Sequence, residues 1–75
     1  MSKRNRQRDT LLAHLREYGS ITQEEARSEY GIARLASRVN DLRKAGIPIR
    51  TVVEIGRNRH GEPVHYARYT LQGGI

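Results

Sequence analysis

The stretch SITQEEARSEYGIARLASRVNDLRKAGIPI, residues 20–49, predicts two short helices joined by a tight turn. Thr22 and Glu25 form the pattern of a capping box, in which each side chain bonds the backbone N–H of the other residue. Gly31 ends the first helix, because glycine adopts the left-handed C′ conformation without steric cost. The second helix is expected over residues 33–45. Two helices around a glycine-containing turn are the arrangement that lets the second helix enter a DNA major groove.

Another helix is expected before this stretch, over residues 6–18. Its apolar side chains recur at three- and four-residue spacing, which places them in one stripe on the helix. We expect that stripe in the core. Its members are Leu11, Leu12, Leu15 and Tyr18.

The C-terminal third of the chain predicts an antiparallel hairpin. Residues 49–55 and 64–71 both alternate apolar and polar side chains, as half-buried strands do. The connection between them, residues 56–63, is too long for a two-residue turn, so a protruding loop is expected. Residues 20–21 are expected as a short extended segment. Three helices followed by a two-stranded antiparallel hairpin predict an α+β fold, the winged helix-turn-helix.

Composition narrows the function. The chain has 75 residues and no cysteine, so we expect a small core, no deep catalytic pocket and a reducing compartment, the cytoplasm. No apolar run approaches the roughly 20 residues of a membrane span. No nucleophile stands beside a base and an acid in a recognisable pattern, and the histidines lack the spacing of metal ligands. We expect no enzymatic activity, cofactor, metal, membrane or small-molecule partner.

Charge points to nucleic acid. The net charge is +6, and arginine supplies 12 of the 14 basic residues; arginine makes bidentate contacts to phosphate and guanine. The positive charge gathers on the elements that would face DNA, whereas residues 17–29 are net acidic. The predicted DNA-binding residues of the second helix of the helix-turn-helix are Arg34, Ser37, Arg38, Asn40, Asp41 and Lys44. Those of the loop are Arg57, Asn58, Arg59 and His60, and those of the N-terminal arm are Lys3, Arg4, Arg6 and Arg8.

Some of these residues have an intramolecular alternative. Arg38 could pair with Asp41 or Glu29 instead of contacting DNA, and Asp41 could equally pair with Lys44. Lys44 could also complement the dipole at the end of its helix. The basic N-terminal residues could form a solvated terminus. The expected organisation is a basic arm (1–8), a DNA-binding domain (9–71) and a flexible tail (72–75).

The segments GSITQEEA (19–26), YGI (30–32) and RLASRVNDLRKAGIPI (34–49) resemble the small helix-turn-helix domain common in phage and prophage genomes. Tyr69 and Leu71 fit the ending of that family's hairpin. The resemblance covers about residues 11–71 and implies a winged helix-turn-helix fold and DNA binding. More distantly, the same region is similar to the DNA-binding domain of the biotin ligase repressor.

The expected function is sequence-specific binding of double-stranded DNA, by a transcription regulator or an accessory factor of recombination or replication. Because one copy covers only a short site, we expect a monomer that dimerises or assembles on DNA. One alternative is a module that binds a host polymerase or replication factor through apolar residues of the hairpin, namely Val52, Val64 and Tyr66. RNA binding is another, since a basic face does not separate RNA from DNA.

Overall fold

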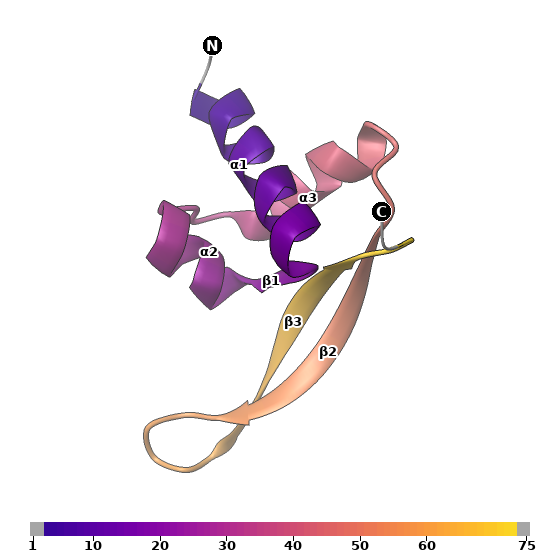
Figure 1. Cartoon of the computed structure of the whole chain (residues 1–75). Coiled ribbons are helices and arrows are strands. Elements are labelled where there is room, and N and C mark those ends of the chain that lie inside the picture. Colours follow the sequence, from indigo (N-terminus) through magenta and orange to yellow (C-terminus); the bar gives the residue numbers. More distant parts are fainter. Residues whose placement is uncertain (1–2, 74–75) are drawn as a thin grey trace.

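The structure, a computed structural model, describes residues 3–73 and their side chains from residue 6 onward. Figure 1 shows the helices gathered above a long hairpin that projects away from them. The elements are α1 (Lys3–Tyr18), β1 (Ser20–Thr22), α2 (Gln23–Tyr30), α3 (Leu35–Lys44), β2 (Ile49–Arg57) and β3 (Pro63–Leu71). This order confirms the predicted α+β fold of three helices followed by a hairpin.

The sheet has three antiparallel strands in the order β1-β3-β2, not the two that the sequence predicts. The short extended segment expected at residues 20–21 pairs with the end of β3, with Ile21 opposite Tyr69. Strand β2 pairs with β3 along its whole length, from Ile49 opposite Leu71 to Arg57 opposite Pro63. The hairpin of β2 and β3, residues 49–71, is the wing of the fold.

The loop of the hairpin is shorter than expected, because both strands continue past the residues that ended their sequence pattern. Asn58 closes the loop: its backbone N–H donates to the Glu62 carbonyl, and its side-chain oxygen accepts from the N–H groups of His60 and Glu62. These bonds satisfy loop backbone groups that a longer open loop would leave to water.

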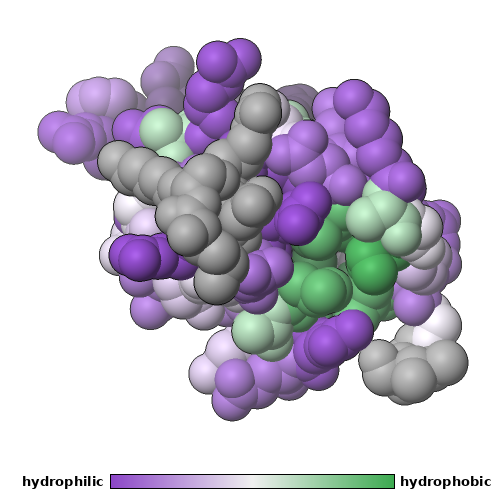
Figure 2. Space-filling model, turned by 90° about the horizontal axis from the view of Figure 1, so that it is seen from above, coloured by the Kyte–Doolittle hydropathy of each residue, from purple (hydrophilic) through white to green (hydrophobic). Residues whose placement is uncertain are grey.

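One core joins the helices to the sheet. Leu11 and Leu15 of α1 are fully buried, as predicted, together with residues of every other helix and of β1 and β2. The core consists of Leu11, Leu15, Ile21, Ala26, Ile32, Leu35, Val39, Leu42 and Ile49. Half-buried apolar residues pack around it, and from above the apolar surface forms one cluster surrounded by hydrophilic residues (Figure 2).

Tyr18 is the exception to the predicted core. It is 66% exposed, and its ring lies on that of His14, with 4.7 Å between the ring centroids. Tyr18 is the last residue of α1. There its ring packs along the helix surface instead of into the core, so its assignment to the core is wrong.

The predicted capping box of α2 is present. The Thr22 hydroxyl accepts from the Glu25 N–H at 3.2 Å, and the Glu25 carboxylate accepts from the Thr22 N–H at 2.9 Å. Gly31 follows the helix with φ of 68°, in the left-handed conformation that a side chain would strain. Local sequence therefore determines both ends of α2.

Helix α3 begins at Leu35, two residues later than expected. Arg34 is its N-cap residue and makes no side-chain capping bond. Gln23 of α2 acts instead: its amide oxygen accepts from the Leu35 N–H at 3.0 Å, and its amide nitrogen donates to the Ile32 carbonyl at 2.8 Å. The cap comes from a distant residue, so no local signal marks the start of α3.

The N-terminal arm expected at residues 1–8 is helical from Lys3, and α1 is longer than predicted. Lysine, arginine and glutamine are good helix formers, and neither glycine nor proline interrupts them. Residues 1–2 and 74–75, and the side chains of Lys3 and Arg4, lie outside the description. At the other end of the chain, the Gln72 N–H donates to the Pro48 carbonyl at 2.8 Å.

Candidate nucleic-acid interface

Helix α3 presents one side to solvent, and that side carries three of the side chains predicted to bind DNA, Ser37, Asn40 and Lys44. Its buried side consists of Leu35, Val39 and Leu42, with Arg38 among them. Along its open side, Ala36, Asn40 and Lys44 are exposed, and Ser37 is half-buried. Alanine and serine leave room for close approach, and the amide of Asn40 matches the donor and acceptor of an adenine edge.

Arg38 and Asp41 contact each other instead of projecting together from the helix. Arg38 is only 9% exposed. Its Nε lies 3.5 Å from a carboxylate oxygen of Asp41, and its Nη2 donates to the Ser37 hydroxyl at 3.1 Å. Of the pairings that the sequence left open, the structure shows this one. A DNA contact by Arg38 or Asp41 would require this ion pair to break.

Arg43, which the predicted set omits, joins α3 to the wing. Its Nε donates to the Ile49 carbonyl at 3.0 Å, and its Nη2 donates to the Thr51 hydroxyl at 2.8 Å. Arg43 is itself exposed. Its position on the flank of the helix was visible in the sequence, but its partners across the Gly46 turn were not.

Four residues at the end of the wing are predicted to bind DNA. Some of them bond other residues of the loop, and some only face solvent. Asn58 is used in closing the loop, and its amide also donates to the Glu62 carboxylate at 3.1 Å. Arg57 donates to the Gly61 carbonyl at 2.7 Å. Arg59 and His60 are exposed at the end of the loop. The wing thus presents a basic tip, which we define as Arg57, Arg59 and His60.

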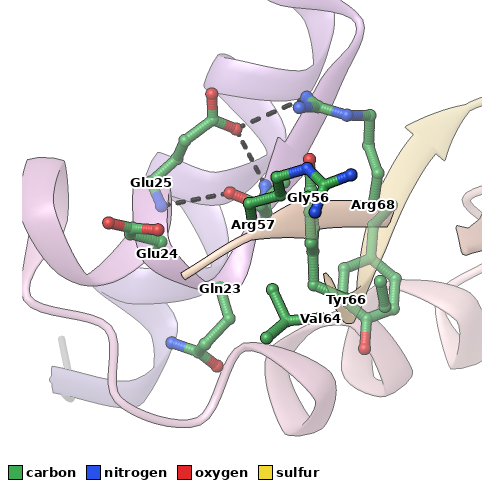
Figure 3. Close-up of a pocket in the computed structure, with 11 residues that line it drawn as sticks. Gln23, Glu24, Glu25, Gly56, Arg57, Val64, Tyr66 and Arg68 are labelled. Carbon is green, nitrogen blue, oxygen red and sulfur yellow. Dashed lines mark hydrogen bonds and ion pairs between the residues drawn. The ribbon is translucent and has the colours of Figure 1, made fainter. Parts of the chain in front are cut away.

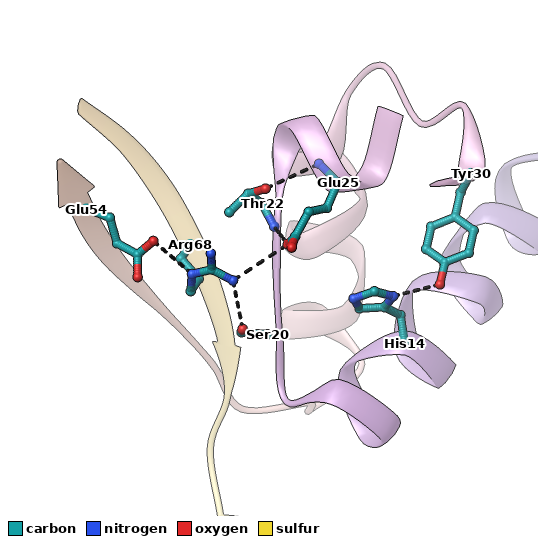
Figure 4. A network of polar contacts seen from close by, with 7 residues as sticks. All are labelled: His14, Ser20, Thr22, Glu25, Tyr30, Glu54 and Arg68. Carbon is teal, nitrogen blue, oxygen red and sulfur yellow. Dashed lines mark hydrogen bonds and ion pairs between the residues drawn. The ribbon is translucent and has the colours of Figure 1, made fainter. Parts of the chain in front are cut away.

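Arg68 links the wing to the helices, a role that no sequence pattern predicts (Figure 4). Its Nε donates to Glu54 of β2 at 2.9 Å. Its Nη1 donates to the Ser20 hydroxyl at 3.1 Å and lies 3.6 Å from the Glu25 carboxylate that caps α2. The hydrogen bond from Arg68 lowers the pKa of Glu54, and the same bond raises the pKa of Arg68. These partners are too far apart in the chain for spacing to reveal them.

A groove of about 520 Å³ separates the first turn of α2 from the wing (Figure 3). Glu24 and Glu25 line it on the α2 side, and Arg57 and Arg68 line it from the wing. A Cβ on Gly56 would lie 2.9 Å from the Tyr66 ring, so glycine lets that ring lie against β2. Both charge signs meet here, so the groove selects no single class of ligand.

His14, Tyr18 and Tyr30 form an aromatic cluster on α1 and α2. The His14 Nδ1 lies 2.6 Å from the Tyr30 hydroxyl, and the two rings meet edge to face (Figure 4).

In the part of the chain that the structure describes, no three histidine or acidic side chains are placed to hold a metal ion. Nor is any helix within residues 3–73 long and apolar enough to cross a membrane.

The predicted site residues therefore fall into separate groups. Exposed to solvent are Arg34 at the N-cap of α3, Asn40 and Lys44 on its open side, and Arg57, Arg59 and His60 at the tip of the wing. Of the predicted N-terminal contacts, Arg6 is exposed and Arg8 half-buried on α1.

Comparison with protein families identifies the fold family. A family model described as a winged helix-turn-helix domain matches residues 6–73. No curated protein and no solved structure gives a significant match.

Proposed function

Because the chain belongs to the winged helix-turn-helix domain family, we propose that it binds double-stranded DNA, with α3 in the major groove and the wing on the neighbouring backbone. The observation that carries the proposal is the open side of α3. It combines small residues, which allow close approach, with Asn40 and Lys44, which can bond a base edge and a phosphate.

Affinity and specificity would come from different groups. The basic tip of the wing and Arg34 would neutralise phosphates and release condensed counterions, so binding would weaken as salt rises. Asn40, in the middle of the exposed side of α3, would select the base sequence. Arg38 and Asp41 would support this helix through their ion pair instead of reading bases.

We propose sequence-specific binding in a transcription regulator, or in an accessory factor of recombination or replication, of phage or prophage type. The resemblance of residues 11–71 to small phage and prophage domains supports this role. The proposal includes no enzymatic activity and no cofactor. It places the protein with the DNA of a bacterial host cell, where copies would assemble on neighbouring sites.

Selection from a library of random duplexes, followed by sequencing, tests the proposal. We expect an enriched motif for the wild-type protein and a relaxed motif for Asn40→Ala. Arg16→Ala is the control, because Arg16 is exposed and belongs to α1 instead of to α3 or the wing. It should keep the motif. Enrichment of no motif, or equal relaxation in both variants, would contradict sequence reading by α3.

A further inference from the structure

A valine and an isoleucine side chain of the wing are more exposed than any other large aliphatic side chain in the described part of the chain. Val53 is 66% exposed and Ile55 is 69% exposed. They lie two residues apart on β2, so they share one face of the ribbon. Exposed aliphatic side chains placed together on a small protein indicate a contact surface.

The face that carries them begins at the core and at α3. Alternate residues of β2 lie on the same side of the strand, and the first residue on this side, Ile49, is buried. The next, Thr51, accepts the hydrogen bond from Arg43 of α3. The apolar row, defined as Thr51, Val53 and Ile55, therefore starts where the exposed flank of α3 ends.

The same face ends at the basic tip. Arg57 continues the row on β2, and Arg59 and His60 follow in the loop. Across the ribbon the row pairs with Tyr69, Ala67 and His65 of β3, none of which is acidic. Positive charge thus stands at both ends of the row, on Arg43 and on the tip.

The opposite face of the wing is less exposed, and it carries basic residues of its own, Arg50 and Arg68. Its apolar residues Val52 and Val64 are each 37% exposed, and Tyr66 is 40% exposed. The ion pair of Glu54 with Arg68 interrupts them. Part of this face borders the groove against α2. Val52 and Val64 therefore serve as control positions for substitution, because they do not belong to a continuous exposed apolar row.

We propose that Val53 and Ile55 contact DNA. Their side chains would pack against deoxyribose carbons in the minor groove, next to the major groove that α3 enters. The inference rests on the proposed function. It adds an apolar DNA contact between the basic contacts of α3 and those of the basic tip. A polyanionic partner is favoured because basic groups flank the row. Proteins that bind the minor groove often insert apolar side chains between base steps, so apolar contacts to DNA have precedent there.

The test compares two double variants on the selected duplex. Val53→Thr with Ile55→Thr makes the row polar and keeps the β-branched shape that suits a strand. Val52→Thr with Val64→Thr makes the same kind of change on the opposite face. Affinity is measured over a series of salt concentrations, and thermal unfolding checks that each variant folds. Because all four residues are on the wing and partly or largely exposed, neither variant should lose its fold.

We expect the first variant to bind roughly tenfold more weakly, by loss of apolar contact, and the second to bind like the wild type. The dependence of affinity on salt should stay the same in the first variant, because an apolar contact releases no counterion. Arg57→Ala should instead make the fall of log affinity with log salt concentration less steep, by about the contribution of one phosphate contact.

Wild-type affinity in the first variant would overturn the inference, and so would equal losses in both double variants. If the first variant bound DNA normally but lost self-association in sedimentation, the row would be a protein contact and the inference would be wrong. Failure of the proposed function is distinct: the wild-type protein would then select no duplex at all.

Discussion

Arg38 and Arg43, five residues apart on α3, show how the same side chain takes different positions. Arg38 lies on the buried side of the helix, where its stem packs with the core and its head group meets Asp41. Arg43 lies on the exposed side and donates to Ile49 and Thr51 at the start of β2. Helical periodicity separated the apolar residues of α3 correctly. It could not show which arginine the neighbouring elements would cover.

The position of Arg38 leads to a stability prediction. Arg38→Ala should lower the free energy of unfolding by about 1–3 kcal/mol, because it removes buried stem atoms and leaves Asp41 without its partner. Arg38→Met, which keeps an unbranched stem of similar reach, should cost less. Urea unfolding of the variants measures both effects. Equal losses in the two variants would show that the ion pair, and not the packed stem, accounts for the stabilisation.

At the scale of elements, α2 is the part that orients the others. Its first residue, Gln23, bonds both sides of the turn before α3, and Glu25, in its first turn, meets Arg68 of β3. The capping box of α2 was predictable because its two residues are three apart. The cap of α3 was not, because Gln23 stands 12 residues before Leu35. Local signals predict an element's own ends, whereas its junctions depend on residues distant in sequence.

Gln23 should therefore matter more than a half-exposed glutamine usually does. Gln23→Ala removes both bonds of the turn and should lower the free energy of unfolding by about 1–3 kcal/mol. Gln23→Glu keeps an acceptor for the Leu35 N–H but loses the donor to the Ile32 carbonyl, so its loss should also be measurable. Chemical denaturation tests this, and Gln72→Ala provides a control on an exposed amide side chain. If Gln23→Ala were as stable as that control, the two bonds of Gln23 would not stabilise the turn before α3.

The ion pair of Glu54 with Arg68 predicts a pH dependence of the junction between the wing and the helices. The hydrogen bond from Arg68 lowers the pKa of Glu54 below its usual value of 4.5. A carboxyl group with a lowered folded-state pKa stabilises the fold above its unfolded-state pKa. That contribution is lost as pH falls through the folded-state pKa. The free energy of unfolding should therefore decrease in the acid range.

Glu54→Gln should remove part of that dependence, because the amide does not titrate. The measurement is the urea midpoint of wild type and variant between about pH 6 and about pH 3. Glu17→Gln is the control, since Glu17 is exposed on α1 and makes no ion pair within the described residues. If Glu54→Gln retained the full acid dependence of the wild type, the stabilising role of the pair would be wrong.

At the scale of the whole molecule, the chain is small and its charge is unevenly distributed. It extends over 41 × 27 × 20 Å, with basic groups on α3 and on the tip of the wing and acidic ones on residues 17–29. Composition and periodicity predicted the three helices, the hairpin and this separation of charge. They could not predict the pairing of residues 20–22 with β3, the burial of Arg38 or the Arg68 contacts, because these arise only when distant segments meet.

The size of the molecule predicts how it occupies DNA. The protein, of 8.6 kDa, should sediment as a monomer without DNA. On a duplex with two copies of its site about ten base pairs apart, the second copy should bind more tightly than a copy on a single site. Titration of one-site and two-site duplexes measures this difference. Equal affinity per site, at every spacing tried, would contradict assembly on DNA.

The central claim is that α3 and the wing together form the DNA surface. Backbone amide chemical shifts of the isotope-labelled protein, recorded during titration with the selected duplex, test it most directly. We expect the largest changes at Ala36, Asn40 and Lys44 of α3 and at residues 53–60 of the wing, with little change over residues 17–29. Changes concentrated on residues 17–29, or no changes at any ratio of duplex to protein, would contradict it.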